Sequence, residues 1–406
     1  MIRMLPNLAA VALCVGSCTS SGAGTDQAGR FTLQDSSGIR IVITEATEWT
    51  GVDTLEPQAM LRVHASDEGA TSPIGSVGAG ELLEDGRIAV LDRIAQTVVF
   101  YAPDGREAFR FGRKGQGPGE FSAAVTLQEQ NDGAVLVYDR ALGRLTEVLP
   151  DGAAGNVTTL AAELFERPPY YAWRLADGRV VTWEIDVARR SVEGQSGDAR
   201  RAVIPGTLRI SDLQDGTSDT VFTAPAREMI EQGSRLWFGP FGPVAVMGIR
   251  HDVLYFSTAE RHEVRVIGLD DGQQGIYRFP GLDEAVARSE LSRLEDEGRS
   301  EAADLGVEFE AGVIFDPALQ PPIRPAFEGL RVAGDGVIWA KQQEPFSGGD
   351  SEWWVVSANG HFRGRVGLPT GATILSMGTD VMLVSVLDDF DVPSIELWLI
   401  PQELSQ

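Results

Sequence analysis

Short apolar runs separated by turn-forming dipeptides dominate the chain after about residue 38. One stretch reads LLEDGRIAVLDRIAQTVVFYAPDGREAFRFG, and the next reads LQEQNDGAVLVYDRALGRLTEVLPDG. In both, Asp-Gly dipeptides join apolar runs, which is the strongest short-range signal for a β-hairpin. The pattern therefore predicts consecutive units of four antiparallel strands, repeating about every 48 residues.

The same pattern of strands and turns recurs, less regularly, to the end of the chain. A third copy runs WRLADGRVVTWEI, followed by a long loop and then LRISDLQDGTSDTVFTA. Later copies begin at VAVMGIRHDVLYF, FEGLRVAGDGVIWA and ATILSMGTDVMLVSV. The last copy supplies only three strands, and an extra strand around Met60 to His64 precedes the first copy, so we expect these two ends to join. Six radial four-stranded sheets closed in this way form an all-β, six-bladed β-propeller.

The glycine-rich stretch RFGRKGQGPGEF, residues 110–121, joins the first two units. Its glycines permit positive φ values and Pro118 fixes φ, so the stretch predicts a tight, defined loop. No helical periodicity follows Phe121, whereas a dinucleotide or phosphate loop requires a helix at that place. We therefore interpret the stretch as a connector between two sheets, with Phe121 wedged between them.

One segment, residues 282–325, interrupts the repeats between the fourth and fifth units. Apolar residues at helical spacing, Leu282, Val286, Leu291 and Leu294, predict a helix, and a proline-rich return follows it. The segment is acidic, and it follows the last strand of the fourth unit. Two placements remain open at this point: a cap over the channel, or a helix packed against the outside of the neighbouring sheets.

Composition narrows the function classes. The chain holds 59 acidic and 34 basic residues, a formal net charge of −25, which disfavours binding to nucleic acid or to an anionic membrane surface. With 46 Gly and 21 Pro among 406 residues, the composition suits many turns and short strands.

The N-terminus has the layout of an export signal. Arg3 precedes an apolar run that ends in Val15-Gly16-Ser17-Cys18, and a Ser/Gly-rich stretch follows. This resembles a bacterial lipoprotein signal, with residues 1–17 removed, Cys18 lipidated and residues 18–37 forming a tether. The resemblance implies attachment to a bacterial membrane, with Thr19 after the cysteine pointing to the outer membrane and the periplasm. An ordinary secretory signal with an incidental cysteine is the alternative.

The glycine motif between Asp-Gly hairpin units resembles the NHL-repeat type of propeller, and in particular a bacterial family of six-bladed β-propeller lipoproteins. The resemblance covers residues 38–406, although only one junction keeps the full GxGxGPGEF pattern. It implies an exported recognition domain, and it supplies no catalytic motif, no cofactor and no metal ligand to transfer.

Propeller topology sorts the loops onto two faces. The loops between second and third strands and those between sheets share one face, called here the top face, and the Asp-Gly hairpins lie on the other, the bottom face. The aspartates of these hairpins are expected to be turn formers. The basic residues of the top loops are candidate ligand contacts: Arg93, Arg113, Lys114, Arg140, Arg144, Arg261 and His262. They form either a solvated rim of mixed charge or a mouth that attracts anions.

Two aromatic pairs are further candidates for ligand contacts. Trp353-Trp354 and Trp237-Phe238 could stack on sugars or on partner side chains, but large aromatic residues commonly fill the wedge between sheets. We expect packing between sheets for both pairs.

Enzymatic alternatives require residues that the sequence does not gather. The four histidines, His64, His251, His262 and His361, fall on different strands and turns, so the metal cluster of an amidating lyase is not expected. The calcium site of a gluconolactonase-like hydrolase has no counterpart either, and no GxSxG elbow is present.

The sequence therefore predicts a lipid-anchored, extracytoplasmic, non-catalytic propeller that binds or scaffolds an unknown protein, peptide or anionic saccharide. A hydrolase or lyase with a divergent channel site, with or without a metal, is the alternative.

Overall fold

The computed structural model describes residues 31–44, 53–54, 58–64, 74–160, 165, 167–279, 281, 284–309, 312–343, 350–402 and 404. The predicted signal peptide, Cys18 and residues 19–30 of the predicted tether lie outside the described residues. Residues 31–36, at the end of that tether, form β1 (Phe31–Ser36), which pairs with β2 (Ile39–Thr44).

Six sheets lie among the described residues, each built largely from consecutive strands. The first contains β5 (Val77–Leu82), β6 (Ile88–Asp92), β7 (Thr97–Tyr101) and β8 (Glu107–Phe111). The second contains β9 (Ala124–Glu129), β10 (Val135–Asp139), β11 (Arg144–Val148) and β12 (Ala154–Thr159). The third contains β13 (Tyr171–Arg174), β14 (Val180–Ile185), β15 (Ser191–Ser196), β16 (Ala199–Asp212), β17 (Thr217–Gln232) and β18 (Arg235–Trp237).

The remaining three sheets each recruit a strand from the N-terminal region. The fourth contains β19 (Val246–Arg250), β20 (Val253–Ser257), β21 (Glu263–Gly268) and β22 (Gln274–Arg278), extended by β2 and β1. The fifth contains β23 (Phe327–Val332), β24 (Ile338–Gln342), β25 (Ser351–Val356) and β26 (Phe362–Leu368), extended by β3 (Asp53–Thr54). The sixth contains β27 (Ala372–Met377), β28 (Val381–Leu387), β29 (Pro393–Leu399) and β4 (Ala59–His64).

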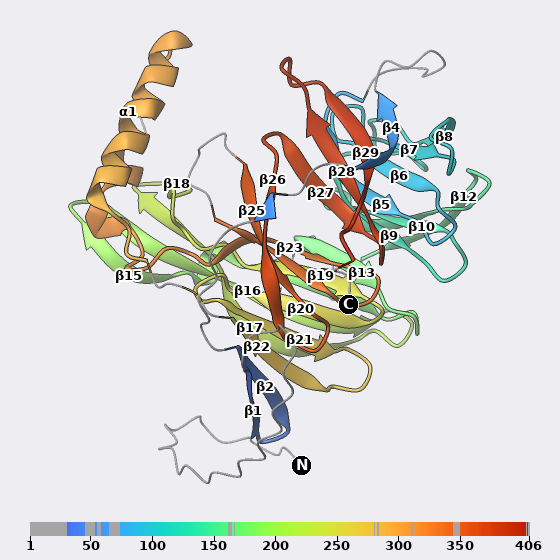
Figure 1. The fold of residues 1–406 in the computed structure, drawn as a ribbon, viewed down its shortest axis with the longest axis horizontal. Coiled ribbons are helices and arrows are strands. Elements are labelled where there is room, and N and C mark those ends of the chain that lie inside the picture. Colours follow the sequence, from blue (N-terminus) through green and yellow to red (C-terminus); the bar gives the residue numbers. More distant parts are fainter. Residues whose placement is uncertain are drawn as a thin grey trace.

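The first strands of the six sheets surround a common centre (Figure 1). β5 packs beside β9 and β27, β9 beside β13, and β23 beside β19 and β27. β13 and β19 contribute Trp173 and Met247 to one apolar cluster. The chain is thus an all-β propeller, as the repeats predict, and the first strand of each sheet lines the channel.

The N-terminal strand joins the last sheet as predicted. β4 pairs antiparallel with β29, placing Val63 opposite Ile395 and Leu61 opposite Leu397. Val63 and Ile395 are both buried and share an apolar cluster with residues of the first sheet. The outer strand of the sixth sheet therefore comes from a different part of the chain than its three inner strands.

The central strands are buried on both faces, which explains their continuous apolar runs. All five residues of β6 and of β10 are buried, including the aspartates that end them, Asp92 and Asp139. Asp92 accepts hydrogen bonds from the N–H groups of Gly75, Ile94 and Ala95, and Asp139 accepts three in the same way from top loops. These carboxylates hold the loops in place, because buried acceptors require such partners.

The third sheet differs from the prediction. The stretch expected to be a long loop contains β15 and the first half of β16, and β16 pairs with β17 in a hairpin of strands 14 and 16 residues long. Its buried positions alternate, but several are small, such as Ala199, Ala202 and Gly206. Pro205 and Pro225 face one another in the pairing. Small residues and proline weaken the period-two apolar pattern by which strands are identified.

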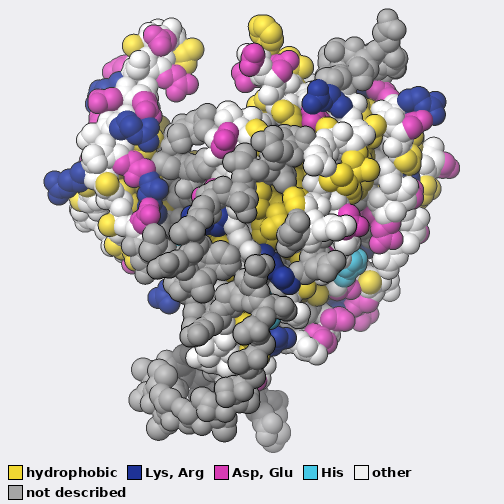
Figure 2. All heavy atoms as spheres, in the orientation of Figure 1, with side chains coloured by type: hydrophobic (Ala, Val, Ile, Leu, Met, Phe, Trp, Pro, Cys, Tyr) yellow, Lys and Arg dark blue, Asp and Glu magenta, His cyan; other side chains and the backbone are white. Residues whose placement is uncertain are grey.

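The insertion forms α1 (Arg288–Asp304), followed by the 3-10 helices η2 (Gly312–Phe315) and η3 (Pro317–Leu319). Leu291 and Leu294 of α1 are buried in a cluster with Phe241 and Phe315. The helix lies at the edge of the molecule beside β15 and β18, far from the inner strands (Figure 1). The cap hypothesis is therefore wrong, since the apolar stripe of the helix packs on Phe241 and Phe315, in the loop before β19 and in η2, and not over the inner strands. The exposed surface of α1 mixes acidic and basic side chains (Figure 2).

Candidate functional site

A hollow of about 520 Å³ opens where the inner strands of the first four sheets reach the bottom face. We call it the central hollow. Its walls are polar and come from the first four sheets: Glu81, Glu84, Gln128, Glu129, Gln130, Asn131, Asp132, Glu147, Arg174, Leu175, Ala176, Gly178, Ile249, Arg250, His251 and Asp252. Few apolar side chains reach it, so a ligand would be recognised mainly by charge and hydrogen bonding.

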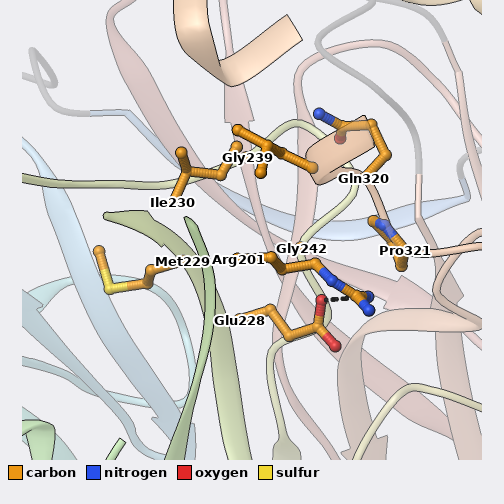
Figure 3. A pocket seen from close by; sticks show the side chains of 9 residues that line it. Arg201, Glu228, Met229, Ile230, Gly239, Gly242, Gln320 and Pro321 are labelled. Carbon is orange, nitrogen blue, oxygen red and sulfur yellow. Dashed lines mark hydrogen bonds and ion pairs between the residues drawn. The ribbon is translucent and has the colours of Figure 1, made fainter. Parts of the chain in front are cut away.

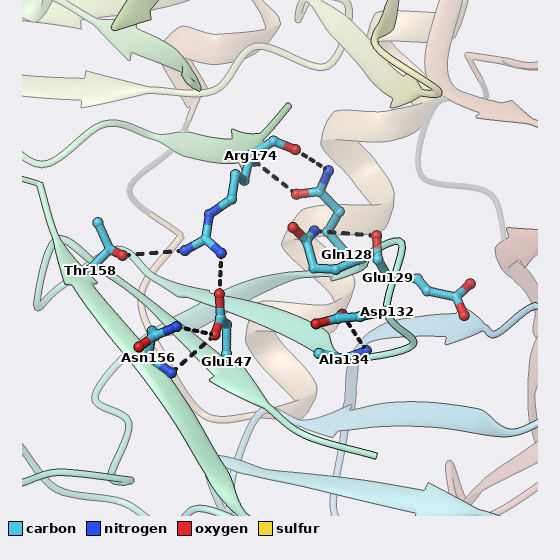
Figure 4. Close-up of polar contacts among 9 residues, drawn as sticks. Gln128, Glu129, Asp132, Ala134, Glu147, Asn156, Thr158 and Arg174 are labelled. Carbon is cyan, nitrogen blue, oxygen red and sulfur yellow. Dashed lines mark hydrogen bonds and ion pairs between the residues drawn. The ribbon is translucent and has the colours of Figure 1, made fainter. Parts of the chain in front are cut away.

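Polar links between neighbouring sheets build one wall of the central hollow (Figure 4). The Arg174 guanidinium forms an ion pair with Glu147 and donates a hydrogen bond to Thr158. The side chain of Gln128 exchanges two hydrogen bonds with the backbone of Arg174, at 2.8 and 2.9 Å. Burial opposes ionisation of Glu147, but hydrogen bonds from Arg174 and Asn156 outweigh it and lower the pKa of Glu147. The charges of Arg174 and Glu147 in this wall therefore neutralise each other.

A second ion pair crosses the channel. Glu81 on β5 lies 3.3 Å from the Arg250 guanidinium on β19, and the first and fourth sheets stand opposite in the ring. The Glu81 side chain is only 16% exposed. Burial raises the pKa of Glu81 to about 7, and Arg250 only partly offsets this. Deeper in the channel, Arg331 donates hydrogen bonds to the carbonyls of Ile374 and Leu330.

The charges around the central hollow do not balance. Six carboxylates, from Glu81, Glu84, Glu129, Asp132, Glu147 and Asp252, face two guanidiniums. Glu81 and Glu147 pair with those guanidiniums, whereas the other four carboxylates form no ion pair among the described residues. Burial and the nearby carboxylates of Glu84 and Asp85 raise the pKa of Glu129. The hollow is therefore a region of concentrated negative charge.

Two of these carboxylates also hold the backbone. Glu129 accepts hydrogen bonds from the Glu84 N–H at 3.0 Å, and Asp252 accepts from the Ala176 N–H at 3.1 and 3.2 Å. His251 and Asp252 take positive φ values of 47° and 57° in the turn between β19 and β20. Residues other than glycine rarely adopt this conformation, so the turn carries backbone strain beside the hollow.

Most residues of this site are not predicted from the sequence. Asp132 and Asp252 were treated as turn formers, and Asp132 does bind the N–H two residues later. Glu81, Glu129 and Arg250 lie on inner strands and were not singled out. The sequence does contain one signal for this site. Polar residues precede the Asp-Gly turn in two consecutive units, LLEDG and LQEQNDG.

The candidate residues of the connector loop serve the loop itself. Arg113 pairs with Glu120, whose carboxylate also accepts hydrogen bonds from the N–H groups of Gln116 and Gly117. The Gly117 N–H, and after it Arg113, lowers the pKa of Glu120. Arg144 donates to the carbonyls of Gln116, Gly117 and Glu120. The position that a phosphate would take in such a loop is thus held by the chain's own carboxylate.

Phe121 packs between two sheets, as expected for this connector. It is fully buried in a cluster shared by the first and second sheets. Gly112, with φ of +87°, leaves room for it, because a Cβ there would lie 2.5 Å from the Phe121 ring. The connector is therefore a structural joint.

The other candidates lie on top loops, and the structure does not bring them into one cluster. Arg93, Lys114, Arg140 and Arg261 are exposed. Arg93 donates to Ser76, and Arg140 lies over the ring of Tyr170. His262 stacks on Trp354 with ring centroids 4.9 Å apart and meets Phe327 edge-on, so it fills the space between two sheets.

The aromatic pairs divide between the two interpretations. Trp353 and Trp354 are buried, as expected for packing between sheets. Phe238 is 56% exposed, so the expectation does not hold for it. It lies in the loop between β18 and β19, and the Arg227 guanidinium lies over its ring.

A second, very small cavity of about 10 Å³ lies where the long hairpin meets η3 (Figure 3). The ion pair of Arg201 and Glu228, at 3.2 Å, lines it. A space of this size holds at most one water molecule. It is a packing feature of the hairpin.

Two further observations concern the described residues alone. No three His, Cys, Asp or Glu side chains in this part of the chain are placed to bind one metal ion. None of its helices combines the length and the apolar character needed to cross a bilayer.

No family model and no curated protein matches this sequence. Among solved structures, a Bacteroides fragilis protein described as exported aligns at 12% identity and a TM-score of 0.48, covering 86% of this chain and 98% of that one. Virginiamycin B lyase from Staphylococcus aureus aligns at 12% identity and a TM-score of 0.43, covering 84% and 99%. A Xanthomonas campestris gluconolactonase aligns at 10% identity and a TM-score of 0.43, covering 84% and 98%. At these values the similarity carries no information on function.

Proposed function

We propose that this chain is a binding propeller whose central hollow receives a positively charged ligand. The observation that supports this is the charge imbalance of six carboxylates against two guanidiniums around a space of about 520 Å³. A cation in the hollow would relieve the repulsion that Glu84 and Asp85 exert on Glu129. The ligand class that fits best is a peptide segment rich in arginine or lysine.

This assignment differs from the anion-attracting mouth considered from the sequence. Arg113 and Arg144, the basic residues nearest the connector loop, are occupied by Glu120 and by loop carbonyls. At the bottom face, the unpaired charge of the channel is negative. Electrostatic attraction in such a cleft raises both affinity and the rate of association of a basic ligand.

Binding of a capped tetra-arginine peptide, measured by isothermal titration calorimetry, tests the proposal. The double variant Glu84→Gln/Glu129→Gln removes two charges from the hollow and is expected to weaken binding about tenfold or more. The matched control, Asp104→Asn/Asp151→Asn, removes two charges from outer hairpins of the same face. Equal losses of affinity in both variants would show that only the net charge of the protein matters, and would overturn the assignment. Equally tight binding of an uncharged tetra-citrulline peptide would also overturn it.

A catalytic role for the same hollow is the second candidate, favoured by Glu81 alone. A carboxyl group whose pKa is raised to about 7 in a cleft suits general acid-base catalysis near neutral pH. Turnover of a panel of ester, lactone and glycoside substrates is the test. For a catalytic Glu81, the variant Glu81→Gln lowers kcat by roughly 100-fold or more. The kcat of the wild type then changes with pH around pH 7. An unaffected rate in the variant contradicts it.

We also propose that Cys18 is lipidated and anchors the propeller to a bacterial outer membrane on its periplasmic side. Support comes from the sequence layout alone, with small residues before Cys18 and a Ser/Gly-rich segment after it. Expression of the full chain in a bacterium, followed by membrane fractionation, tests this. Cys18→Ser is expected to move the protein from the membrane to the soluble fraction, and retention in the membrane would contradict the anchor.

A further inference from the structure

Four side chains form an alternating stack of guanidinium and aromatic groups on the top face. The Arg140 guanidinium lies 4.7 Å from the centre of the Tyr170 ring, and the Arg227 guanidinium lies 4.9 Å from the same ring. Arg227 also lies 5.6 Å from the centre of the Phe238 ring. The order is therefore Arg140, Tyr170, Arg227, Phe238, and we call it the arginine stack.

The arginine stack lies at the opposite end of the channel from the central hollow. Tyr170 immediately precedes the inner strand β13, whereas Arg174 at the other end of that strand lines the hollow. Arg227 pairs with Val244, just before the inner strand β19, whose far end is Arg250. Arg140 comes from the loop between β10 and β11. Three separate segments thus converge at the top mouth.

The positive charge of the arginine stack is not neutralised within the described residues. No carboxylate there pairs with Arg140 or Arg227, although each lies close in sequence to an acidic residue. Asp139 is saturated by three backbone N–H groups, and Glu228 is paired with Arg201. The Nε–H of Arg227 is buried with no hydrogen-bond partner.

The stack also polarises a hydroxyl group. Burial favours the neutral form of Tyr170, but hydrogen bonds and charge from Arg227, and then from Arg140, outweigh burial and lower the pKa of the phenol. Cation-π stacking alone could serve stability. Both ends of the stack are open to a ligand, since Arg140 is exposed and Phe238 is 56% exposed.

We infer that the arginine stack is a binding site for a carboxylate-bearing saccharide, with Arg140 and Arg227 attracting the carboxylate and Phe238 offering its open ring to the apolar face of a sugar. Planar guanidinium groups are the preferred partners of carboxylates. A peptide C-terminus is less suited, because protein sites for it typically present backbone N–H groups rather than stacked guanidiniums. The site is separate from the central hollow in position and in the charge of its ligand.

Binding of trigalacturonate to the full chain, followed by calorimetry, tests this inference. The wild type is expected to bind trigalacturonate but not neutral trigalactose, and Arg140→Met and Phe238→Ala should each weaken binding about tenfold or more. Arg93→Met is the matched control, an exposed top-face arginine outside the stack, and should change affinity less than twofold. Thermal unfolding of each variant separates loss of binding from loss of folding.

Three results would overturn the inference. They are absence of binding to the folded wild type, equal weakening by Arg93→Met and Arg140→Met, and tighter binding of an acetylated peptide with a free C-terminal carboxylate than of trigalacturonate. The variant Glu84→Gln/Glu129→Gln should leave trigalacturonate binding intact. Tighter binding in that variant would mean that the saccharide occupies the central hollow instead, because removing two carboxylates there lowers the repulsion of an anionic ligand.

Discussion

Single residues of one type take quite different roles in this propeller according to what surrounds them. Asp92 and Asp139 are buried and accept hydrogen bonds from backbone N–H groups, so they hold the neighbouring loops in place. Glu81 is nearly as enclosed, but it faces one guanidinium across the channel and retains the desolvation cost. Glu81 lacks such a set of backbone hydrogen bonds, and burial raises its pKa to about 7.

The raised pKa of Glu81 predicts a pH-dependent stability. Below about pH 4.5 the group is protonated in both states; between 4.5 and about 7 the unfolded chain ionises first, so the free energy of unfolding falls as pH rises. The glutamine side chain of Glu81→Gln does not ionise, so the variant does not lose stability in this way. The stability of the wild type relative to the variant should therefore fall by up to about 3 kcal/mol between pH 4.5 and 8. Urea unfolding at several pH values measures this, and parallel pH dependences would contradict it.

At the scale of elements, turns and central strands were predictable because their causes are local. An Asp-Gly pair sets its own hairpin, and Gly86, Gly105, Gly133 and Gly152 all take the positive φ that such turns require. The long hairpin β16–β17 was missed because small residues and two facing prolines obscure its period. The placement of α1 was undecidable from the sequence, because its partners Phe241 and Phe315 lie in segments without a regular pattern.

The docking of α1 can be tested with two leucines. Leu291 is 2% exposed and packs in the cluster with Phe241, whereas Leu305, just past the helix, is 70% exposed. Leu291→Ala is expected to cost the docked helix about 2 kcal/mol or more, while Leu305→Ala should cost little. Because the helix lies outside the ring, the loss should be local. Hydrogen exchange of α1 amides should be faster by roughly 30-fold in Leu291→Ala, and equal protection in both variants would contradict the packing.

At the scale of the whole molecule, the ring and its closure were predictable, but the site was not. The repeats fix the number of sheets, and the missing fourth strand of the last unit identifies β4 as its completion. The site is different because it joins residues far apart in sequence. Glu81 and Arg250, which pair across the channel, are separated by 169 positions. Only the assembled ring brings them together.

Closure of the ring predicts a contrast between two positions of β4. Val63 is 6% exposed and faces Ile395, while Met60 on the same strand is 62% exposed. Val63→Asp buries an unpaired carboxylate and should destabilise the propeller by about 3 kcal/mol. Met60→Asp should change stability by less than about 0.5 kcal/mol. Thermal and urea unfolding of both variants check this, and a similar small effect at both positions would exclude β4 as an integral strand.

The most direct test of the central claim, that the central hollow binds a cationic ligand, is the number of protons released on binding. Capped tetra-arginine keeps its charge at pH 7, so any proton exchanged comes from the protein. A guanidinium beside Glu81 lowers the pKa of that carboxyl from about 7, and calorimetry in buffers of different ionisation enthalpy should show net proton release at pH 7. We predict that this release disappears in Glu81→Gln while the peptide still binds. Binding without proton release, or release that is unchanged in the variant, would contradict a ligand in the central hollow.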